Sequence, residues 1–180
     1  CSLVTDGGAC VFLASEEVAK KFTDTPIWIA GTGQGSAALS LHDRDDITSF
    51  VATREASRQA YEMAGVGPKD IQIAEVHACF TIAEILAMED LGFYEKGKAT
   101  QAIRSGESKR DGSLPINTSG GLKSKGHPVG ATGAAQAVEI FKQMRGIAER
   151  NRQVKGDLDI TLTHNLGGSG GTCVVTIYKK

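Results

Sequence analysis

Two patterns of hydrophobic and polar residues alternate along this chain. Short runs of apolar residues are typical of buried strands, and apolar residues three or four positions apart are typical of helices with one buried face. The short runs predict strands at residues 9–14, 27–30, 71–76, 157–163 and 172–178, and residues 114–118 form a further short extended piece. The helical spacing is found directly after Ser15, from Asp45 or Asp46 to Ala64, from Thr81, and from Ala134 to Ala148.

Strands and helices alternate from residue 27 onward, and this order predicts an α/β fold with helices on a mostly parallel sheet. The last two strands are joined only by a glycine turn, so we expect this pair to be antiparallel. The expected architecture is therefore a layered α/β/α fold with a mixed, mostly parallel sheet of five strands. The glycines of residues 31–35 predict a loop, although they lack the full dinucleotide-binding pattern G-x-G-x-x-G.

The composition excludes several classes of protein. The 180 residues are enough for one domain with a core, and 20 basic against 21 acidic residues leave a net charge of −1. Without a basic excess, we expect neither nucleic acid nor a membrane as a partner. No apolar run is long enough to cross a bilayer, and no signal peptide is recognisable. The four cysteines form no C-x-x-C pair, which indicates a reducing, cytoplasmic location and provides no metal-site spacing.

A glycine-rich loop from Gly120 to Gly133 carries His127 and leads straight into a helical pattern. Its glycines permit positive φ angles and close approach of a ligand, and Pro128 restricts the residue before it. The helix that follows offers unpaired N–H groups and a partial positive charge at its first turn. A histidine held in such a place suits acid–base chemistry or stabilisation of an oxyanion. The alternative is a glycine-rich surface loop in which His127 has no role.

Two other histidines and a cysteine are expected near His127. His77 and His164 each lie at the carboxyl end of a predicted strand, where ligands bind in open α/β sheets. Cys79 follows His77 by two positions and precedes a helix whose first residues, 81–84, fit a capping box. A neighbouring histidine and a helix N-terminus both lower the pKa of a thiol. We therefore expect Cys79 to have a lowered pKa and to transfer protons.

Structural roles are the alternative for these residues. His164 is followed by an asparagine and a glycine turn, so capping the end of a strand is sufficient reason for it. His42 lies among four charged residues and is expected to be solvated. Cys10 and Cys173 lie inside predicted strands and are interpreted as small buried hydrophobic residues.

Five segments together resemble the thiolase superfamily, and specifically its sterol-carrier-type and archaeal-type branch. They are Asp6–Ala9, His77–Phe80, Asn117–Gly121, Gly126–Gly133 and His164–Gly168. They occur in the family's order along almost the whole chain, and the segment around His127 is the most specific of them. The resemblance implies two similar halves, each with the order βαβαβαββ. Residues 1–25 then hold the last strand and helix of an N-terminal half, and residues 26–180 form the C-terminal domain.

The resemblance also implies roles in catalysis. A cysteine of the first half attacks an acyl-CoA and carries the acyl group as a thioester. His127 activates that cysteine and points a nitrogen at the thioester oxygen. Cys79 takes the α-proton of a second acyl-CoA, and His77 helps to hold the resulting enolate oxygen. Backbone N–H groups of Gly167 and Gly168 are expected to hold the oxyanion of the acyl-enzyme.

Substrate contacts and partners follow from the same resemblance. Gly126, Pro128 and Phe80 are expected to bind the coenzyme A thioester, which is a substrate, so neither a cofactor nor a metal ion is expected. The expected partners are the acyl-CoA, the N-terminal half, and further copies of the chain in a dimer or tetramer. A complex with other CoA enzymes is also compatible with the resemblance.

The chain differs from the family pattern at three places. Ala78 stands in the His-x-Cys-Phe motif where the branch usually has aspartate. The segment from His164 to Leu166 stands where better-known thiolases have Cys-x-Gly, so the acid–base cysteine must be Cys79. Neither Cys1 nor Cys10 lies in the motif of the nucleophilic cysteine.

The expected function is therefore that of an acyltransferase half that is inactive alone. It supplies the acid–base groups, and not the nucleophile, for reversible Claisen condensation of two acetyl-CoA to acetoacetyl-CoA, or for thiolysis of a 3-oxoacyl-CoA. One alternative is a non-catalytic, thiolase-like lipid-carrier or scaffold subunit. Another is a retro-aldolase that acts on a CoA ester, in which we expect tyrosine in place of Cys79 or His127.

Overall fold

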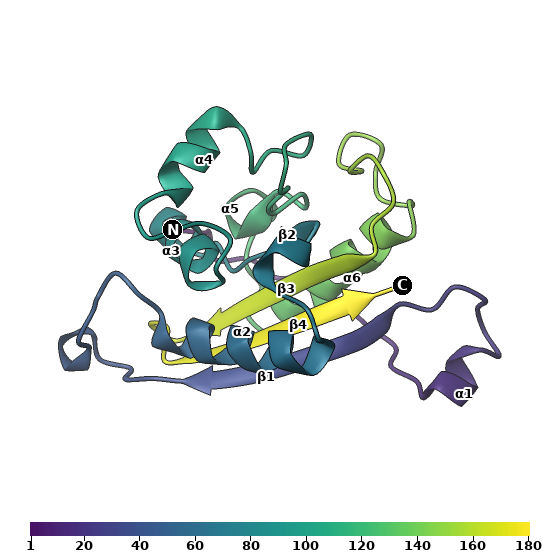
Figure 1. The fold of residues 1–180 in the computed structure, drawn as a ribbon, viewed down its shortest axis with the longest axis horizontal. Coiled ribbons are helices and arrows are strands. Elements are labelled where there is room, and N and C mark those ends of the chain that lie inside the picture. Colours follow the sequence, from purple (N-terminus) through teal and green to yellow (C-terminus); the bar gives the residue numbers. More distant parts are fainter.

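A four-stranded sheet with the strand order β1-β4-β3-β2 lies at the centre of this computed structural model, which describes residues 1–180 (Figure 1). The strands are β1 (Trp28–Ser36), β2 (Ile73–Glu75), β3 (Ile160–Gly167) and β4 (Thr172–Lys179). β4 is antiparallel to both β1 and β3, as predicted for the last pair, and β2 is parallel to β3.

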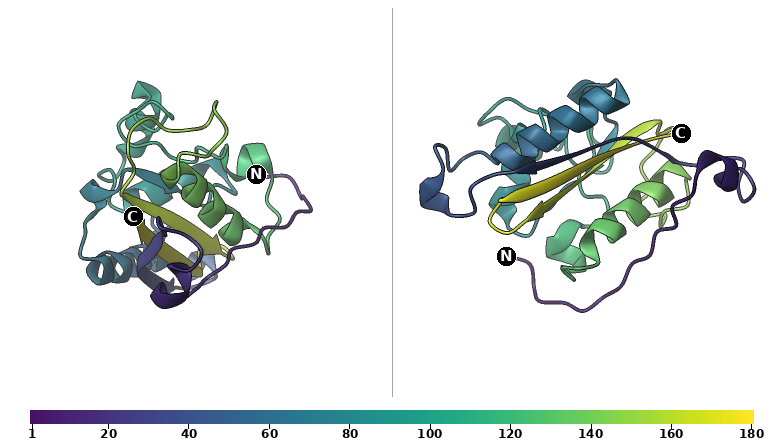
Figure 2. Two further views of the ribbon diagram at one scale, coloured as in Figure 1. Left: turned by 90° about the vertical axis from the view of Figure 1, so that its right-hand side faces the viewer. Right: turned by 90° about the horizontal axis from the view of Figure 1, so that it is seen from below.

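Helices cover both faces of this sheet. The α-helices are α1 (Glu16–Ala19), α2 (Val51–Ala64), α3 (Thr81–Asp90), α4 (Ala99–Ser105), α5 (Gly121–Lys125) and α6 (Thr132–Met144), and the 3₁₀ helices are η1 (Leu41–Asp43) and η2 (Pro68–Asp70). α2 packs against β1 and β4, whereas α6 packs against β3 and β2 on the opposite face (Figure 2). The α/β/α layering expected from the sequence is thereby confirmed.

Two clusters of buried apolar side chains hold these layers together. The larger cluster, of 18 residues, lies between the sheet, α2 and α3, and the smaller cluster, of five residues, joins α6 to β2. Because both clusters include residues of β2, this short strand is buried on both faces. The segment that follows β2 therefore starts from a rigid base.

The prediction of five mostly parallel strands is wrong, because the sheet has four strands and only one parallel pair. Residues 114–118, expected as a short extended piece, contribute only an isolated bridge between Ile116 and Ala74. Pro115 has no N–H group with which to extend a ladder. Asn117 has a φ angle of 55°, which turns the chain away from the sheet.

The glycines of residues 31–35 lie inside β1 and not in the predicted loop. Alternate residues of a strand face the same side, and on this side β1 lies against the backbone of α2. Added Cβ atoms would come within 2.3 Å of backbone oxygens, for Gly31 at Ala60, for Gly33 at Ala56 and for Gly35 at Ala52. Glycines in the strand and alanines four positions apart in the helix therefore allow close packing of the two elements.

Gly33→Ala should lower the free energy of unfolding by about 1–3 kcal/mol or more, the usual range for overpacking. The new Cβ atom would lie 2.0 Å from the carbonyl oxygen of Ala56, so β1 and α2 must move apart. Urea unfolding of the variant and the unaltered protein measures the change. Gly8→Ala is the matched control, because nothing lies within 4 Å of a Cβ atom there. Equal stability of the Gly33 variant would contradict the close contact.

α2 begins later than the sequence predicts. The expected cap at Asp45 or Asp46 is wrong, because the helix starts at Val51. The Asp46 carboxylate instead accepts hydrogen bonds from the N–H and the hydroxyl of Thr48, at 2.7 and 2.6 Å, and stabilises a separate turn. The other end is as predicted, since Gly65 ends the helix with a left-handed φ of 64°.

α3 begins at Thr81 as predicted, but the predicted capping box is absent, and no side chain caps its first turn. Because Thr81 is already the first helical residue, its hydroxyl lies beyond the cap position. The polar stretch at residues 92–113 contains α4. Its Ala99 and Ala102 are buried.

Residues 9–14 form no strand, so the prediction of a buried strand there is wrong. Phe12 and Leu13 are 95% and 76% exposed, because no other strand lies alongside this segment to pair with it. Cys10 is likewise exposed, whereas Cys173 is buried as predicted. Figure 2 shows the segment as an extended arm that runs past α6. Its assignment to a preceding half stays a prediction.

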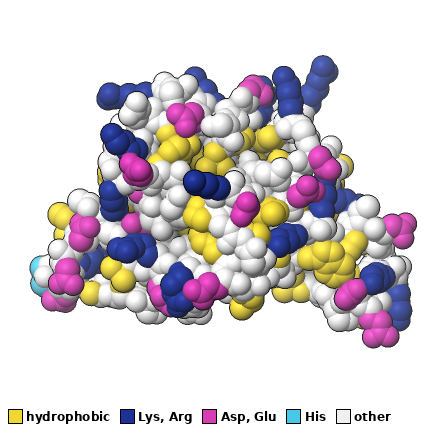
Figure 3. Space-filling model, viewed as in Figure 1, with side chains coloured by type: hydrophobic (Ala, Val, Ile, Leu, Met, Phe, Trp, Pro, Cys, Tyr) yellow, Lys and Arg dark blue, Asp and Glu magenta, His cyan; other side chains and the backbone are white.

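Charged side chains of both signs are spread over the surface seen in Figure 3, with apolar side chains between them. This mixture agrees with the net charge of −1. None of the helices combines the length and the apolar character needed to span a bilayer.

Candidate active site

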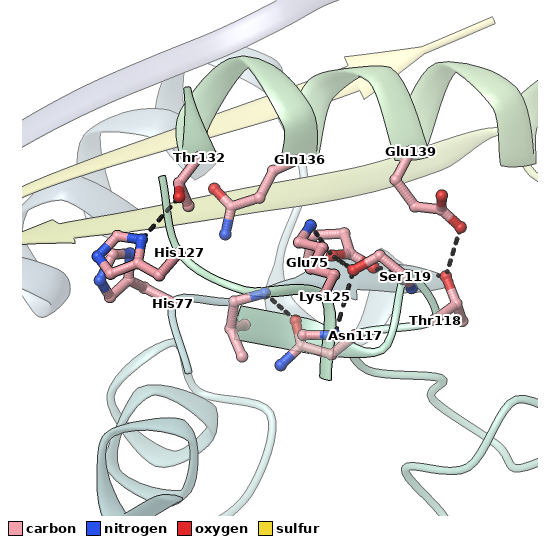
Figure 4. Close-up of polar contacts among 12 residues, drawn as sticks. Glu75, His77, Asn117, Thr118, Ser119, Lys125, His127, Thr132, Gln136 and Glu139 are labelled. Atoms are coloured by element: carbon pink, nitrogen blue, oxygen red, sulfur yellow. Dashed lines mark hydrogen bonds and ion pairs between the residues drawn. The ribbon is translucent and has the colours of Figure 1, made fainter. Parts of the chain in front are cut away.

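Two histidines from distant parts of the chain meet at one end of the sheet. His77 follows β2 by two residues, and His127 lies in the loop between α5 and α6. Their ring centroids are 4.8 Å apart, and the rings are nearly perpendicular, at 86° (Figure 4). The structure thus brings together the two histidines that the sequence placed near one crevice.

The hydrogen bonds of His127 define which ring nitrogen is free. Its Nδ1 lies 2.7 Å from the hydroxyl oxygen of Thr132, the first residue of α6. Because that hydroxyl lies 3.0 Å from the carbonyl oxygen of Pro128, to which it can donate its only proton, we assign it as the acceptor of the Nδ1 proton. Nε2 of His127 therefore keeps its lone pair and can accept a proton. Burial lowers the pKa of His127, which favours this neutral form.

His77 is 4% exposed, and burial is the main cause that lowers its pKa to about 4. The nearby His127 lowers this pKa further, and a hydrogen bond with Asn165 partly opposes both effects. The His77 ring is therefore neutral at pH 7 and offers a hydrogen bond without a full charge. Its Nδ1 is buried and has no hydrogen-bonding partner within the chain.

His164, inside β3, accepts a hydrogen bond from the backbone of His77. It was expected at the end of a strand, but β3 continues to Gly167, and His164 is completely buried. Its Nδ1 accepts a hydrogen bond from the backbone N–H of His77 at 3.3 Å, and its Nε2 lies 3.0 Å from the hydroxyl of Thr53. Burial lowers its pKa to about 3. The structural role considered for His164 therefore fits better than a catalytic one.

Cys79 is half-buried in the turn between β2 and α3. The expected lowering of its pKa is wrong, because burial raises the pKa of this thiol more than backbone N–H groups of Cys79 and Phe80 lower it. At neutral pH the side chain is therefore a thiol with a proton to give. Phe80, next in sequence, is exposed, and its ring is free to contact a ligand.

The glycine turn that ends β3 is held by a neighbouring loop. Gly167 closes the strand and Gly168 has a φ of 59°. The guanidinium of Arg44 donates to the backbone oxygen of Ser169 at 2.5 Å and to that of Ala38 at 2.9 and 3.0 Å. Residues 38–44 therefore fix the backbone of the turn whose N–H groups are candidates for an oxyanion hole.

The N-terminal arm covers the loop that carries His127. A Cβ atom on Gly126 would lie 2.6 Å from the hydroxyl of Thr5, and one on Gly7 would lie 2.7 Å from Pro128. A shallow cavity of about 450 Å³ lies between residues 5–9 and 128–131. The segment Asp6–Ala9 and the His127 loop, both named in the resemblance, are thus neighbours in space.

A larger hollow of about 820 Å³ lies at the opposite end of α6, next to Arg145. The guanidinium of Arg145 is already bonded to Thr23 and Thr25. This hollow is lined by Lys20, Asp24 and Lys180 but by no histidine or cysteine, so we place the candidate site at the histidines. Histidine, cysteine, aspartate and glutamate side chains form no group of three or more with the arrangement of a metal site.

Sequence reasoning missed a buried carboxylate beside the histidines. Glu75, the last residue of β2, is completely buried and contacts Ser119 and Lys125 (Figure 4). The sequence contains an indication of this buried carboxylate, since Glu75 is the single charged residue within the apolar run 71–76. A charge in a buried strand requires partners, and this alone marks the position as special.

Comparison with known proteins gives a consistent result. The family model described as "Thiolase C-terminal domain-like" matches residues 33–180. An acetyl-CoA acetyltransferase of Methanothermobacter thermautotrophicus is 49% identical over 180 residues, which are 100% of this chain and 46% of that protein. Human sterol carrier protein 2 is 39% identical over 184 residues, covering 99% of this chain and 33% of that protein.

A solved structure, the "Ltp2-ChsH2(DUF35) aldolase", superposes with a TM-score of 0.80 and 27% identity, over 91% of this chain and 42% of that one. The acetyl-CoA acetyltransferase of Methanocaldococcus jannaschii is 41% identical over 99% of this chain and 47% of its own length. The chain thus spans about half the length of the acetyltransferases it matches, or less of its other relatives.

Proposed function

This chain belongs to the thiolase family, and we propose that it supplies the acid–base half of an acetyl-CoA C-acetyltransferase. The reaction is the reversible condensation of two acetyl-CoA to acetoacetyl-CoA, or the thiolysis of a 3-oxoacyl-CoA. The observation that carries this proposal is the contact between His77 and His127, in which Thr132 leaves Nε2 of His127 free to accept a proton.

The first step of the proposed reaction forms an acyl-enzyme. A cysteine thiol gives its proton to Nε2 of His127 and attacks the carbonyl carbon of acetyl-CoA. Coenzyme A leaves as a thiolate and takes a proton from the thiol of Cys79. The raised pKa of Cys79 supports this order, because the side chain enters the reaction protonated. Backbone N–H groups of Gly167 and Gly168 stabilise the oxyanion.

The second step forms the carbon–carbon bond. The Cys79 thiolate removes a methyl proton from a second acetyl-CoA, and the neutral ring of His77 donates a hydrogen bond to the enolate oxygen. The enolate carbon attacks the thioester carbonyl, and the nucleophilic cysteine leaves as a thiolate that regains its proton from His127. Protons balance over the cycle, and both groups return to their starting states.

Coenzyme A is a substrate in this proposal and no separate cofactor takes part. Gly126, Pro128 and Phe80 are proposed to contact it, since the first two border the His127 loop and the third is an exposed ring beside Cys79. A cytoplasmic location is part of the proposal.

The nucleophile is proposed to come from an N-terminal thiolase half. In support, the chain spans about half the length of its acetyltransferase relatives, and Cys1 and Cys10 are exposed and lie outside the resembling motifs. The exposed Phe12 and Leu13 are apolar surface that such a half can cover. Assembly into a dimer or tetramer and a complex with other CoA enzymes remain expectations.

A lipid-carrier or scaffold role is the second candidate, because relatives named sterol carrier protein 2 are 39% identical in sequence to this chain. The intact arrangement of His77, Cys79 and His127 favours catalysis. The retro-aldolase alternative has one aldolase relative in its support, but neither Cys79 nor His127 is replaced by tyrosine.

Thiolysis of acetoacetyl-CoA tests the proposed function. Residues 1–180 should show no turnover alone and should gain turnover when joined to the N-terminal half of the Methanothermobacter relative. The assay follows consumption of acetoacetyl-CoA and formation of acetyl-CoA, with the N-terminal half alone as the control. Turnover by residues 1–180 alone would overturn the proposed division of roles. A folded, acylated assembly that forms no acetyl-CoA would favour the carrier role.

A further inference from the structure

The carboxylate of Glu75 is fully buried, and both of its oxygens accept hydrogen bonds. The backbone N–H of Ser119 donates to Oε1 at 3.0 Å, and the hydroxyl of the same residue donates to Oε2 at 2.5 Å. The ammonium of Lys125 lies 3.7 Å from Oε2, and its side chain is mostly shielded from solvent. Burial raises the pKa of Glu75 above its usual value and the nearby Glu139 adds to this, whereas Lys125 and Ser119 lower the pKa and partly oppose the shift.

The two residues of this ion pair lie close in sequence to the two histidines of the candidate site. Glu75 precedes His77 by two residues, and Lys125 precedes His127 by two residues. The backbones are tied together at a second point, since Asn117 donates to the oxygen of Ala74 at 2.9 Å. The two segments that carry the histidines are thus joined through partners that touch neither ring.

We propose that Glu75, through Ser119 and Lys125, is a positioning residue that sets the contact between His77 and His127. The consequence for catalysis rests on the proposed function, whereas the consequence for the geometry of the two rings does not. Lys125 ends α5, so the ion pair fixes the direction in which the chain enters Gly126 and His127.

A glutamine at position 75 cannot accept all the hydrogen bonds that the Glu75 carboxylate accepts. A glutamine has one acceptor oxygen and an NH₂ group that is only a donor. The site presents the N–H and hydroxyl of Ser119, the hydroxyl of Thr118 and the ammonium of Lys125. One of these donors would face another donor. A buried ion pair is in general a weak source of stability compared with apolar residues of similar size, so its presence here is better explained by placement of the loop.

Glu139 provides a matched control in the same region. It is also a buried glutamate, 4% exposed, and its partners are Gln143 at 2.9 Å and Arg152 at 3.7 Å. It shares only the hydroxyl of Thr118 with Glu75, at 3.4 Å from each, and contacts neither Ser119 nor Lys125. It lies about two helical turns beyond Thr132 in α6, away from the residue that bonds His127. Its removal should affect stability without reorienting the histidine.

The test compares Glu75→Gln and Glu139→Gln in the complete enzyme. Because small displacements of reacting groups cost on the order of 10²-fold, Glu75→Gln should lower kcat roughly 10- to 100-fold and leave KM almost unchanged. The NMR signal of the His127 Nδ1 proton, which is bonded to Thr132, should shift in this variant. Glu139→Gln should change neither kcat nor this signal. Equal losses of kcat in both variants would overturn the proposal.

A double-mutant cycle separates positioning from simple destabilisation. Lys125→Met should lower kcat, and adding Glu75→Gln should cause no further loss, because both changes remove one interaction. Lys125→Arg keeps the charge and should retain kcat. Additive losses would contradict the proposal. If the unaltered enzyme has no thiolase turnover, the proposed function fails, and the NMR signal of His127 still tests the positioning role: an unchanged signal in Glu75→Gln overturns it.

Discussion

Replacement of His127 by alanine is expected to prevent acylation of the nucleophile in the complete enzyme, with a loss in kcat of about 10²-fold or more. Nε2 of His127 is the free acceptor beside His77, and Thr132 fixes the ring so that this nitrogen stays unprotonated. Without it, the nucleophile loses its base and the thioester oxygen loses a donor. The neutral His77 cannot replace it, because burial holds its pKa near 4.

The measurement is the mass of the protein after brief mixing with acetoacetyl-CoA, which reports the acetyl group on the nucleophile. His42→Ala is the control, since His42 is exposed and bonds only to Ser40. It should acylate at the parental rate. If His127→Ala acylated as fast as the control, His127 would be a structural loop residue.

The pH dependence of acylation follows from the direction in which the pKa of His127 is shifted. The reactive form is the neutral ring, and burial lowers its pKa, so the neutral form persists below the usual value of about 6.5. The acylation rate should therefore rise with pH through a midpoint below about 6.5 and then become constant. A midpoint above that value would mean that His127 is more exposed, or paired with a negative charge, in the acylating enzyme.

The meeting of His77 and His127 was predictable because it depends on regular elements. A strand that ends at residue 76 and a helix that follows a glycine loop place both rings at one edge of the sheet, and tertiary packing did not override these signals. The strand through Gly31 and Gly35 was not predictable in the same way. Its glycines read as a loop, and only the partner helix, with Ala52 and Ala56, shows why side chains are excluded.

The pKa of Cys79 and the role of Glu75 were missed for a common physical reason. Both depend on how far a group is removed from water, which spacing along the chain does not reveal. For Cys79 the helix N-terminus acts in the predicted direction, but burial outweighs it. For Glu75 the partners Ser119 and Lys125 lie 44 and 50 positions away in sequence.

Replacement of Cys79 by alanine is expected to block condensation and to slow acyl transfer from acetyl-CoA less than His127→Ala does, because coenzyme A can leave as a thiolate. Cys79 is the proposed proton donor to coenzyme A and the proposed base for the second acetyl-CoA, whereas His127 serves the nucleophile. Loss of one positioned acid–base group usually lowers the rate about 10²–10⁴-fold. The raised pKa of the Cys79 thiol means that its thiolate arises during the reaction, when coenzyme A takes the proton.

Exchange of deuterium from solvent into the methyl group of acetyl-CoA isolates this proton transfer. The unaltered enzyme should catalyse the exchange, and Cys79→Ala should lose it by about 10²–10⁴-fold while the acyl-enzyme is still detected by mass. Cys10→Ala is the control, because Cys10 is exposed and lies in the N-terminal arm, outside the candidate site. Cys1→Ala is a second control, because the backbone N–H of Ser2 donates to the backbone oxygen of Cys79 at 2.8 Å and so places Cys1 next to Cys79. Parental exchange in Cys79→Ala would remove Cys79 from the mechanism and assign the α-proton to another base.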